Sequence, residues 1–208
     1  MDNPKVWFID ENQQQSETYA DILRRQFPKN ISVETICPPL AKTQDYLGLL
    51  NTPEIACFII DQRLKDTGIA NYFGIELALF LRSINTKLPI YILTNFAEDS
   101  DAFKEGEWSV EDIIAKSDLA KVSSDKSKAI IARILRRIAG YSDYLAERER
   151  KFQELLRKTL HGQMSPEDEK ELDEIQFDRT SSILAEELPK LQELNKLLEE
   201  YKKITDRH

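Results

Sequence analysis

Short apolar runs alternate with longer amphipathic stretches over the first ~120 residues, and this alternation constrains the fold more than any other feature of the chain. Continuous β-branched runs bounded by polar residues are typical of strands that are covered on both faces. Strands that alternate with helices form a parallel sheet with helices on both sides. We therefore predict an α/β fold built on a five-stranded, doubly wound parallel sheet, in which ligands bind at the carboxyl ends of the strands. The predicted strands are Val6–Ile9, Ile31–Ile36, Ile55–Ile60, Ile90–Leu93 and Ile113–Ala115, and the clearest amphipathic stretches are Ser16–Phe27 and Ile75–Leu81.

The chain changes character near Ser123, after which no strand-like run remains. Apolar residues then recur at heptad spacing, which is typical of helices with a coiled-coil-like stripe. His161 is followed by Gly162, which indicates a helix end because glycine adopts the left-handed conformation at little cost. Ser165 followed by Pro166 indicates the start of another helix. The first stripe comprises Ile131, Ile138, Leu145 and Phe152 with Ile134, Tyr141 and Leu155, and the second comprises Phe177, Leu184, Leu191 and Leu198 with Leu188, Leu194 and Tyr201.

These changes divide the chain into a predicted first domain over residues 1–122 and a helical extension over residues 123–208, which we call the tail. A helix at about 124–139 is expected to continue from the first domain into the tail. The tail is predicted to be a helical hairpin or a coiled coil, and Pro189 is expected to kink or break its second helix because proline removes a backbone hydrogen bond. Apolar residues at helical spacing usually form a core, but a lone two-helix hairpin has little against which to bury them. The tail would then fold back on the first domain, bind another protein or pair with a second copy, and we favour self-association.

The charge of the chain argues against two classes of partner. The formal net charge is −8, of which residues 1–122 carry −7 and the tail −1. Such a chain is poorly suited to sequence-independent nucleic-acid binding or to an anionic membrane surface. The start of the sequence lacks the pattern of a signal peptide, and Cys37 and Cys57 are too few for a disulfide framework. We therefore expect a cytoplasmic protein.

Acidic and polar residues follow four of the predicted strands at the points where they end. Asp10 and Glu11 follow the first strand, Asp61 the third, Thr94 the fourth and Lys116 the fifth. Parallel strands bring such residues to one edge of the sheet, where three crowded carboxylates are costly without a cation. Oxygen-only ligands favour a hard metal, most plausibly Mg²⁺. A carboxylate beside Mg²⁺ can attack a phosphoryl group, with Lys116 and the Thr94 hydroxyl stabilising the developing charge.

Each of these residues has a plainer interpretation when taken alone. Asp and Thr are common after strands because they cap the helix that follows. Four strand ends carrying the required residue types in the required order are much harder to attribute to capping. We therefore favour the joint functional interpretation.

Four short segments resemble the response-regulator receiver family. They are Phe8-Ile9-Asp10-Glu11-Asn12, Phe58-Ile59-Ile60-Asp61, Ile92-Leu93-Thr94-Asn95 and Ile114-Ala115-Lys116, and Gly74-Ile75-Glu76-Leu77 is similar to the usual start of the family's third helix. The resemblance covers about residues 4–139 and implies the flavodoxin-like receiver fold.

The resemblance also implies a role for each residue at the strand ends. Asp61 would accept the phosphoryl group, and Asp10, Glu11, the Asp61 carboxylate and the backbone carbonyl of Arg63 would hold Mg²⁺. Thr94 would be the switch hydroxyl and Lys116 the lysine that binds the phosphoryl group. The phosphodonor would be a phosphohistidine on a sensor histidine kinase or a histidine phosphotransferase. The chain would be a signalling module, not a metabolic enzyme.

The sequence departs from the family pattern at several positions. The loop from Asp61 to Gly74 is longer than usual and carries Lys65 where the family usually has proline. Asn95 replaces the small residue after the switch threonine, and Ser117 replaces the proline after the lysine. Ile113 stands where the family usually has an aromatic switch partner. These departures predict intact phosphorylation chemistry with an altered output.

Other activities fit the sequence less well. A haloacid-dehalogenase-type phosphatase needs a second aspartate two residues after the nucleophile, where Arg63 follows Asp61 and Asn12 follows Asp10. A P-loop or dinucleotide site needs a glycine-rich turn after the first strand, and none is present. His161 is better explained as a helix-end residue than as a phosphotransfer histidine. The tail has 17 basic and 18 acidic residues and no compact three-helix pattern, so it is not a DNA-binding output.

Two functions therefore remain open. The leading hypothesis is a response regulator that is phosphorylated on Asp61 with Mg²⁺ and signals through its helical tail as a homodimer or with a protein partner. The alternative is a phosphorylation-independent scaffold or adaptor, which Ile113 and the long Asp61–Gly74 loop favour.

Overall fold

The predicted sheet is confirmed in a computed structural model of the chain, which describes residues 3–52, 54–95, 97, 103 and 106–205. Five parallel strands form one sheet in the order β2-β1-β3-β4-β5. The order reverses direction beside β1, which is the switch point where doubly wound sheets bind ligands. The strands are β1 (Lys5–Ile9), β2 (Ser32–Ile36), β3 (Ile55–Ile60), β4 (Ile90–Thr94) and β5 (Asp112–Ala115).

Helices cover both faces of the sheet, as a doubly wound fold requires. On one face, α1 and the first half of α5 pack over Phe8, Ile59 and Leu93. On the other face, α2 and α3 pack over Ile9, Phe58 and Ile92. Successive residues of a strand therefore point alternately into the two cores on opposite faces of the sheet, which explains why β3 is buried along its whole length. The helices are α1 (Gln13–Gln26), α2 (Leu47–Leu50), α3 (Gly74–Ile84), α4 (Lys116–Ala120), α5 (Asp125–Leu160) and α6 (Pro166–Thr205).

Two connections between strands, β2 to β3 and β4 to β5, contain little regular helix in the described part of the chain. α2 has four residues and is preceded by a 3₁₀ turn over Thr43–Tyr46. Between β4 and β5 the described residues hold only a 3₁₀ turn over Glu107–Ser109, with Phe103 buried against the core. Among the described residues, the α2 side of the sheet therefore has less helical cover than the α1 side.

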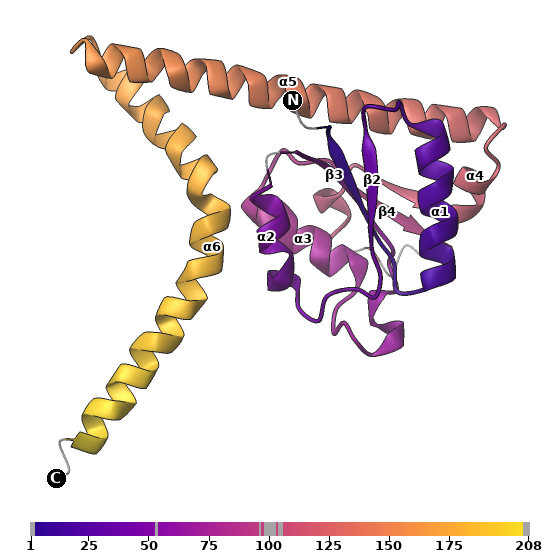
Figure 1. Ribbon diagram of the computed structural model, residues 1–208, viewed down its shortest axis with the longest axis horizontal. Helices are drawn as coiled ribbons and strands as arrows, with labels where there is room; N and C mark the ends of the chain where they lie inside the picture. Colours follow the sequence, from indigo (N-terminus) through magenta and orange to yellow (C-terminus); the bar gives the residue numbers. More distant parts are fainter. Residues whose placement is uncertain (1–2, 53, 96, 98–102, 104–105, 206–208) are drawn as a thin grey trace.

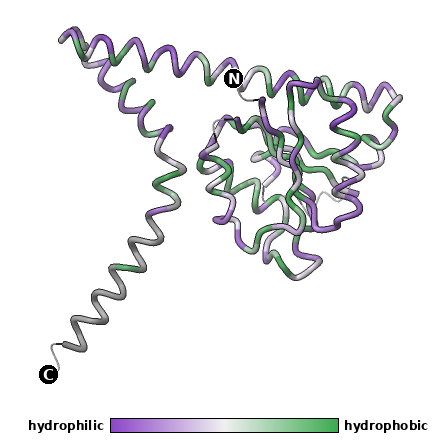
Figure 2. Tube along the Cα trace, viewed as in Figure 1, coloured by the Kyte–Doolittle hydropathy of each residue, from purple (hydrophilic) through white to green (hydrophobic). Residues whose placement is uncertain are grey.

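The tail begins within the packing of the first domain. Ser124 caps α5 by accepting a hydrogen bond from Ser127 N. Ile131, Ile134 and Ile138 of the first predicted stripe are buried against the sheet, whereas Leu145 is 39% exposed. α5 then extends beyond the sheet in Figure 1, and Figure 2 shows hydrophilic residues alternating with apolar ones along it. The first residues of this stripe are therefore buried in the core of the first domain and not in a contact with another chain.

The predicted turn between two helices is confirmed. His161 ends α5 and Gly162 has a φ of 65°, the left-handed conformation that favours glycine. Ser165 Oγ accepts from Asp168 N, and Asp168 Oδ2 accepts from Ser165 N, so the two residues cap the start of α6 reciprocally.

Of the two outcomes expected at Pro189, the break is absent, because α6 runs without interruption from Pro166 to Thr205. The helix does change direction partway along its length (Figure 1), as the alternative expectation of a kink requires. A proline removes one hydrogen bond, and the bonds on either side of it are enough to keep a long helix continuous. The side chains of Leu188, Leu191, Leu198 and Tyr201, which belong to the second predicted stripe, lie outside the part of the structure that is described. Phe177, Leu184 and Leu194 of that stripe are each more than half exposed.

The second tail helix does not run alongside the first. α5 and α6 diverge from their shared turn, and α6 returns to the first domain at α2 and α3 (Figure 1). Ala185 packs against the core on that face, and Ser181 Oγ, which donates to the Asp178 carbonyl at 2.9 Å, lies 3.4 Å from the carbonyl of Ile84. Ion pairs between Arg148 and Asp178 and between Arg179 and Glu149 join the two helices.

A cavity of about 730 Å³ lies between α5, α6, the carboxyl ends of α2 and α3 and the start of β3. Tyr141, Tyr144, Phe177 and Asn85 are among its lining residues. In the described part of the chain, no helix has both the length and the apolar character needed to cross a membrane.

Candidate functional site

The strand ends bring the predicted residues to one edge of the sheet. Ile9 pairs with Ile60, so Asp10 and Asp61 leave neighbouring strands at the same level. Lys116 follows β5 directly and opens α4. Asp10, Asp61 and Lys116 are each at least 96% buried, which is unusual for charged side chains unless they are paired.

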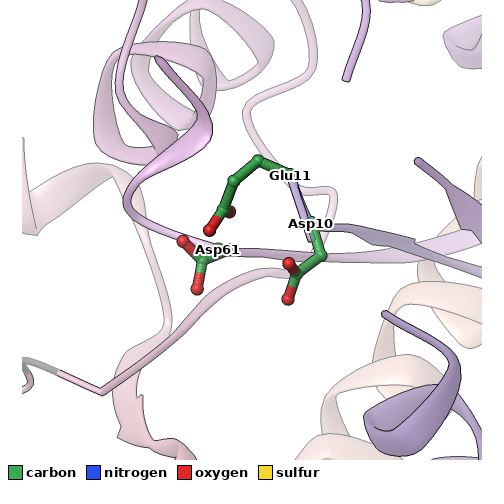
Figure 3. A group of neighbouring side chains, drawn as sticks. All are labelled: Asp10, Glu11 and Asp61. Atoms are coloured by element: carbon green, nitrogen blue, oxygen red, sulfur yellow. The ribbon is translucent and has the colours of Figure 1, made fainter. Parts of the chain in front are cut away.

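Asp10, Glu11 and Asp61 form an acidic cluster (Figure 3). One carboxylate oxygen from each of the three lies within 4.8 Å of the others. Glu11 Oε2 is buried and has no hydrogen-bond partner among the described residues. Burial, followed by the negative charge of Asp61, raises the pKa of Glu11 to about 7. Burial also raises the pKa of Asp10, against the lowering effect of Lys116.

This cluster fits a hard divalent cation. The donors are all carboxylate oxygens, which hard cations prefer. One of them, Glu11 Oε2, is buried without a hydrogen-bond partner among the described residues, and the Glu11 side chain points towards the other two carboxylates (Figure 3). A cation among them would relieve the repulsion that raises the pKa of Glu11. The fourth expected ligand, the Arg63 carbonyl, accepts a hydrogen bond from Asp66 N at 3.0 Å, and a carbonyl can accept a second bond.

Lys116 links the two buried aspartates. Its Nζ lies 2.8 Å from Asp10 Oδ2 and 2.8 Å from Asp61 Oδ1. Burial lowers the pKa of this ammonium, but the charges and hydrogen bonds of Asp61 and Asp10 outweigh burial and raise it. Lys116 is therefore positively charged at neutral pH and compensates part of the acidic cluster.

The chain after Asp61 is held tightly to the start of α3. Asp61 Oδ2 accepts from Arg63 N at 2.5 Å. Gln62 Oε1 accepts from Ile75 N at 3.0 Å, and the Gln62 carbonyl accepts from Gly74 N at 2.9 Å. A Cβ on Gly74 would stand 2.1 Å from the Asp61 carbonyl oxygen, so this position requires glycine.

The remaining predicted positions lie around this edge or on β5. Thr94 ends β4 and is buried, and Asn95 after it is exposed. Lys65 Nζ lies 3.3 Å from the centroid of the Phe73 ring, so it ties the long loop to the start of α3. Ile113 on β5 packs against the core on the α3 side. Their switch roles stay predictions.

One residue of the site was not predicted. Gln15 Oε1 accepts from Lys116 Nζ at 2.7 Å. A run of three glutamines, Gln13 to Gln15, gave no signal in the sequence, because only the helical phase of α1 turns one of them towards Lys116.

Three comparisons with known proteins bear on the fold. No family model matches the chain, and no curated protein matches it. Among solved structures, the signal receiver domain of an HD domain-containing protein from Pseudomonas fluorescens Pf-5 is 14% identical with a TM-score of 0.51, covering 72% of this chain and 95% of that domain. This likeness shows that the first part of the chain has the receiver fold, as predicted.

Two further solved structures resemble the chain. The receiver domain of the Francisella response regulator 1452 is 21% identical with a TM-score of 0.46, covering 66% of this chain and 98% of that one. The response regulator TrrA of Thermotoga maritima, solved in complex with Mg(2+)-BeF, is 14% identical with a TM-score of 0.47, covering 63% of this chain and 98% of that one.

Proposed function

We propose that this chain is a response regulator that accepts a phosphoryl group on Asp61 in the presence of Mg²⁺. The observation that carries the proposal is the buried Lys116 ammonium, 2.8 Å from Asp61 Oδ1 and beside the acidic cluster. A phosphoacceptor needs a nucleophilic oxygen, a cation site and a fixed positive charge in one place. The donor would be a phosphohistidine on a sensor histidine kinase or a histidine phosphotransferase.

In this reaction an Asp61 carboxylate oxygen forms a bond to phosphorus while the phosphorus–nitrogen bond of the donor breaks. The electron pair of that bond stays on the imidazole nitrogen. One N–H of the Lys116 ammonium would turn from its Asp61 acceptor to a phosphoryl oxygen. The positive charge of Lys116 would then offset the negative charge that develops on that oxygen. Asp10, Glu11, Asp61 and the Arg63 carbonyl would hold Mg²⁺, which when bound neutralises negative charge at the site.

The tail would be the output, and α3 supplies a connection between it and the site. The amino end of α3 is bonded to Gln62, next to the phosphoacceptor. At its other end, Asn85 Nδ2 donates to the Tyr141 hydroxyl of α5 at 2.9 Å, and the carbonyl of Ile84, the last residue of α3, lies 3.4 Å from Ser181 Oγ of α6. A shift at the Asp61 loop would therefore reach both tail helices through one short helix, without the aromatic partner that Ile113 replaces.

This function is signalling, not metabolic catalysis, and the tail would act on protein partners or on a second copy of the chain. Phe177, Ile183, Leu184 and Leu194 leave apolar surface exposed on α6. Exposed apolar surface on a helix is typical of a protein contact.

Mass spectrometry of the intact chain after incubation with acetyl phosphate and Mg²⁺ tests the proposal. We expect the mass of one added phosphoryl group, its absence in Asp61→Ala, and its retention in Asp66→Ala. Asp66 is a matched control because it lies in the same loop and is about half exposed. No added phosphoryl group in the wild type, or one that persists in Asp61→Ala, would overturn the proposal.

A phosphorylation-independent scaffold is the second candidate, and the packing of the partly buried Ile113 against the core favours it. An isoleucine fixed in this way lacks the ring whose rotation would report the state of Thr94. Light scattering with and without beryllofluoride distinguishes the two candidates. A change in mass or in partner binding supports the phosphorylated regulator, and unchanged values support the scaffold.

A further inference from the structure

Gln15 is the third partner of the Lys116 ammonium. An ammonium group has three N–H donors. Here they meet Asp10 Oδ2 at 2.8 Å, Asp61 Oδ1 at 2.8 Å and Gln15 Oε1 at 2.7 Å. Lys116 is 99% buried, so these partners replace the water that would otherwise solvate the group. Every donor of the ammonium is used before any phosphoryl group arrives.

The position of Gln15 is fixed by its own backbone. Its N–H donates to the side chain of Asn12, the cap of α1, at 3.0 Å. Asn12 N in turn donates to Asp10 Oδ1 at 2.8 Å. Asn12 therefore joins two of the three partners of the Lys116 ammonium, Asp10 and Gln15. One turn further along α1, the ring of Tyr19 lies 5.4 Å from Lys116 Nζ.

Gln15 differs from the other two partners in carrying no charge. A glutamate at this position would place a third carboxylate on the Lys116 ammonium, next to the acidic cluster of Asp10, Glu11 and Asp61. An apolar residue would leave one ammonium donor buried without an acceptor, which is costly. A neutral acceptor therefore satisfies Lys116 without competing with Asp61 for its charge.

We propose that Gln15 is a positioning residue that keeps Lys116 Nζ directed at the phosphoacceptor. During phosphoryl transfer, the donor that points at Asp61 must turn to a phosphoryl oxygen. Asp10 and Gln15 keep the other two donors, so the ammonium pivots in place and does not withdraw along its flexible side chain. This inference rests on the proposed function of Asp61 and extends its machinery to α1.

The test compares Gln15→Met with Gln14→Met in the full chain. Methionine preserves the length of the side chain and removes the acceptor, and Gln14 is the exposed neighbour on the same helix. The maximal rate of phosphorylation by acetyl phosphate should fall about tenfold in Gln15→Met, the expected effect of losing one hydrogen bond to a charged group. The half-saturating Mg²⁺ concentration should stay within a factor of about two, because Gln15 acts on the lysine and not on the cation. Gln14→Met should match the wild type in both values.

A double-mutant cycle separates positioning from a merely structural role. If Gln15 acts through Lys116, Gln15→Met should have no further effect on the residual rate of Lys116→Ala. An unchanged rate in Gln15→Met, or an equal loss in the Lys116→Ala background, would overturn the inference while leaving Asp61 phosphorylation intact. If the wild type takes up no phosphoryl group, the proposed function fails and this inference fails with it.

Discussion

Lys116 Nζ lies 2.8 Å from Asp61 Oδ1 and thereby joins the end of β5 to the end of β3 across the intervening strand β4. Both groups are almost completely buried. The pair is the centre of the site, because the acidic cluster, Gln15 and the start of α3 are all bonded to one of its two members or lie against it.

Lys116→Met should destabilise the metal-free protein. Removing one partner of a buried pair leaves the carboxylates of Asp10 and Asp61 without compensation, which costs about 3–5 kcal/mol of unfolding free energy. Chemical denaturation without Mg²⁺ measures the loss, and the exposed Lys121→Met is the control. Added Mg²⁺ should restore part of the stability, and an equal loss in both variants would contradict the assignment.

Mg²⁺ binding should weaken as the pH falls through 7. Burial and the charge of Asp61 raise the pKa of Glu11 to about 7, so below this pH a proton and the cation compete for one carboxylate. The half-saturating Mg²⁺ concentration should rise by about tenfold per pH unit well below 7, as measured by titration calorimetry. Glu11→Gln should lose this dependence. An affinity that is the same at pH 7 and pH 6 would argue against a role for Glu11.

The raised pKa of Glu11 makes the stability of the metal-free protein change with pH in the opposite direction to the Mg²⁺ affinity. The pKa of Glu11 rises from its usual 4.5 to about 7, so the folded state holds the proton more tightly than the unfolded state. The unfolding free energy without Mg²⁺ should therefore decrease as the pH rises from 4.5 to 7 by the Glu11 contribution. Denaturation of the wild type and Glu11→Gln across this range isolates that contribution, which saturating Mg²⁺ should abolish.

Gly74→Ala should disturb the junction between the phosphoacceptor and α3. The added Cβ would meet the Asp61 carbonyl oxygen at 2.1 Å, and backbone cannot move aside as a flexible side chain can. We expect a loss of about 1–3 kcal/mol or more in unfolding free energy, together with slower phosphorylation. Gly140→Ala is the matched control, since a Cβ there meets nothing within 4 Å and its helical position should favour alanine by about 0.5–1 kcal/mol. Similar effects at the two glycines would refute the close-approach argument.

Ile175→Ala should loosen α6 from the rest of the chain. Ile175 is 2% exposed, and truncation of a buried isoleucine costs about 2–5 kcal/mol. Hydrogen exchange of α6 amides should accelerate, whereas Leu160→Ala should have little effect because Leu160 is 84% exposed. Unchanged exchange in Ile175→Ala would show that this contact does not hold the helix.

Several parts of the molecule were predictable because their signals are local. The apolar runs at Val6–Ile9 and Ile55–Ile60 marked strands, and the polar residues after them marked one edge of the sheet. Gly162 marked the turn between the tail helices. Pro189 marked no break, because the hydrogen bonds on either side of a proline keep a long helix continuous, although α6 does change direction along its length. Gln15 was missed, because a hydrogen bond between residues 101 positions apart leaves no pattern in either segment.

The sequence alone determined the order of elements, the five parallel strands and the identity of Asp10, Glu11, Asp61 and Lys116 as residues at one sheet edge. Strand and helix periodicities are local, and parallel strands place their carboxyl ends together. Only the tertiary structure decided which neutral side chain meets Lys116 and which face of the first domain receives α6. Both depend on how separate helices are rotated and packed against each other, and many distant contacts set that geometry together.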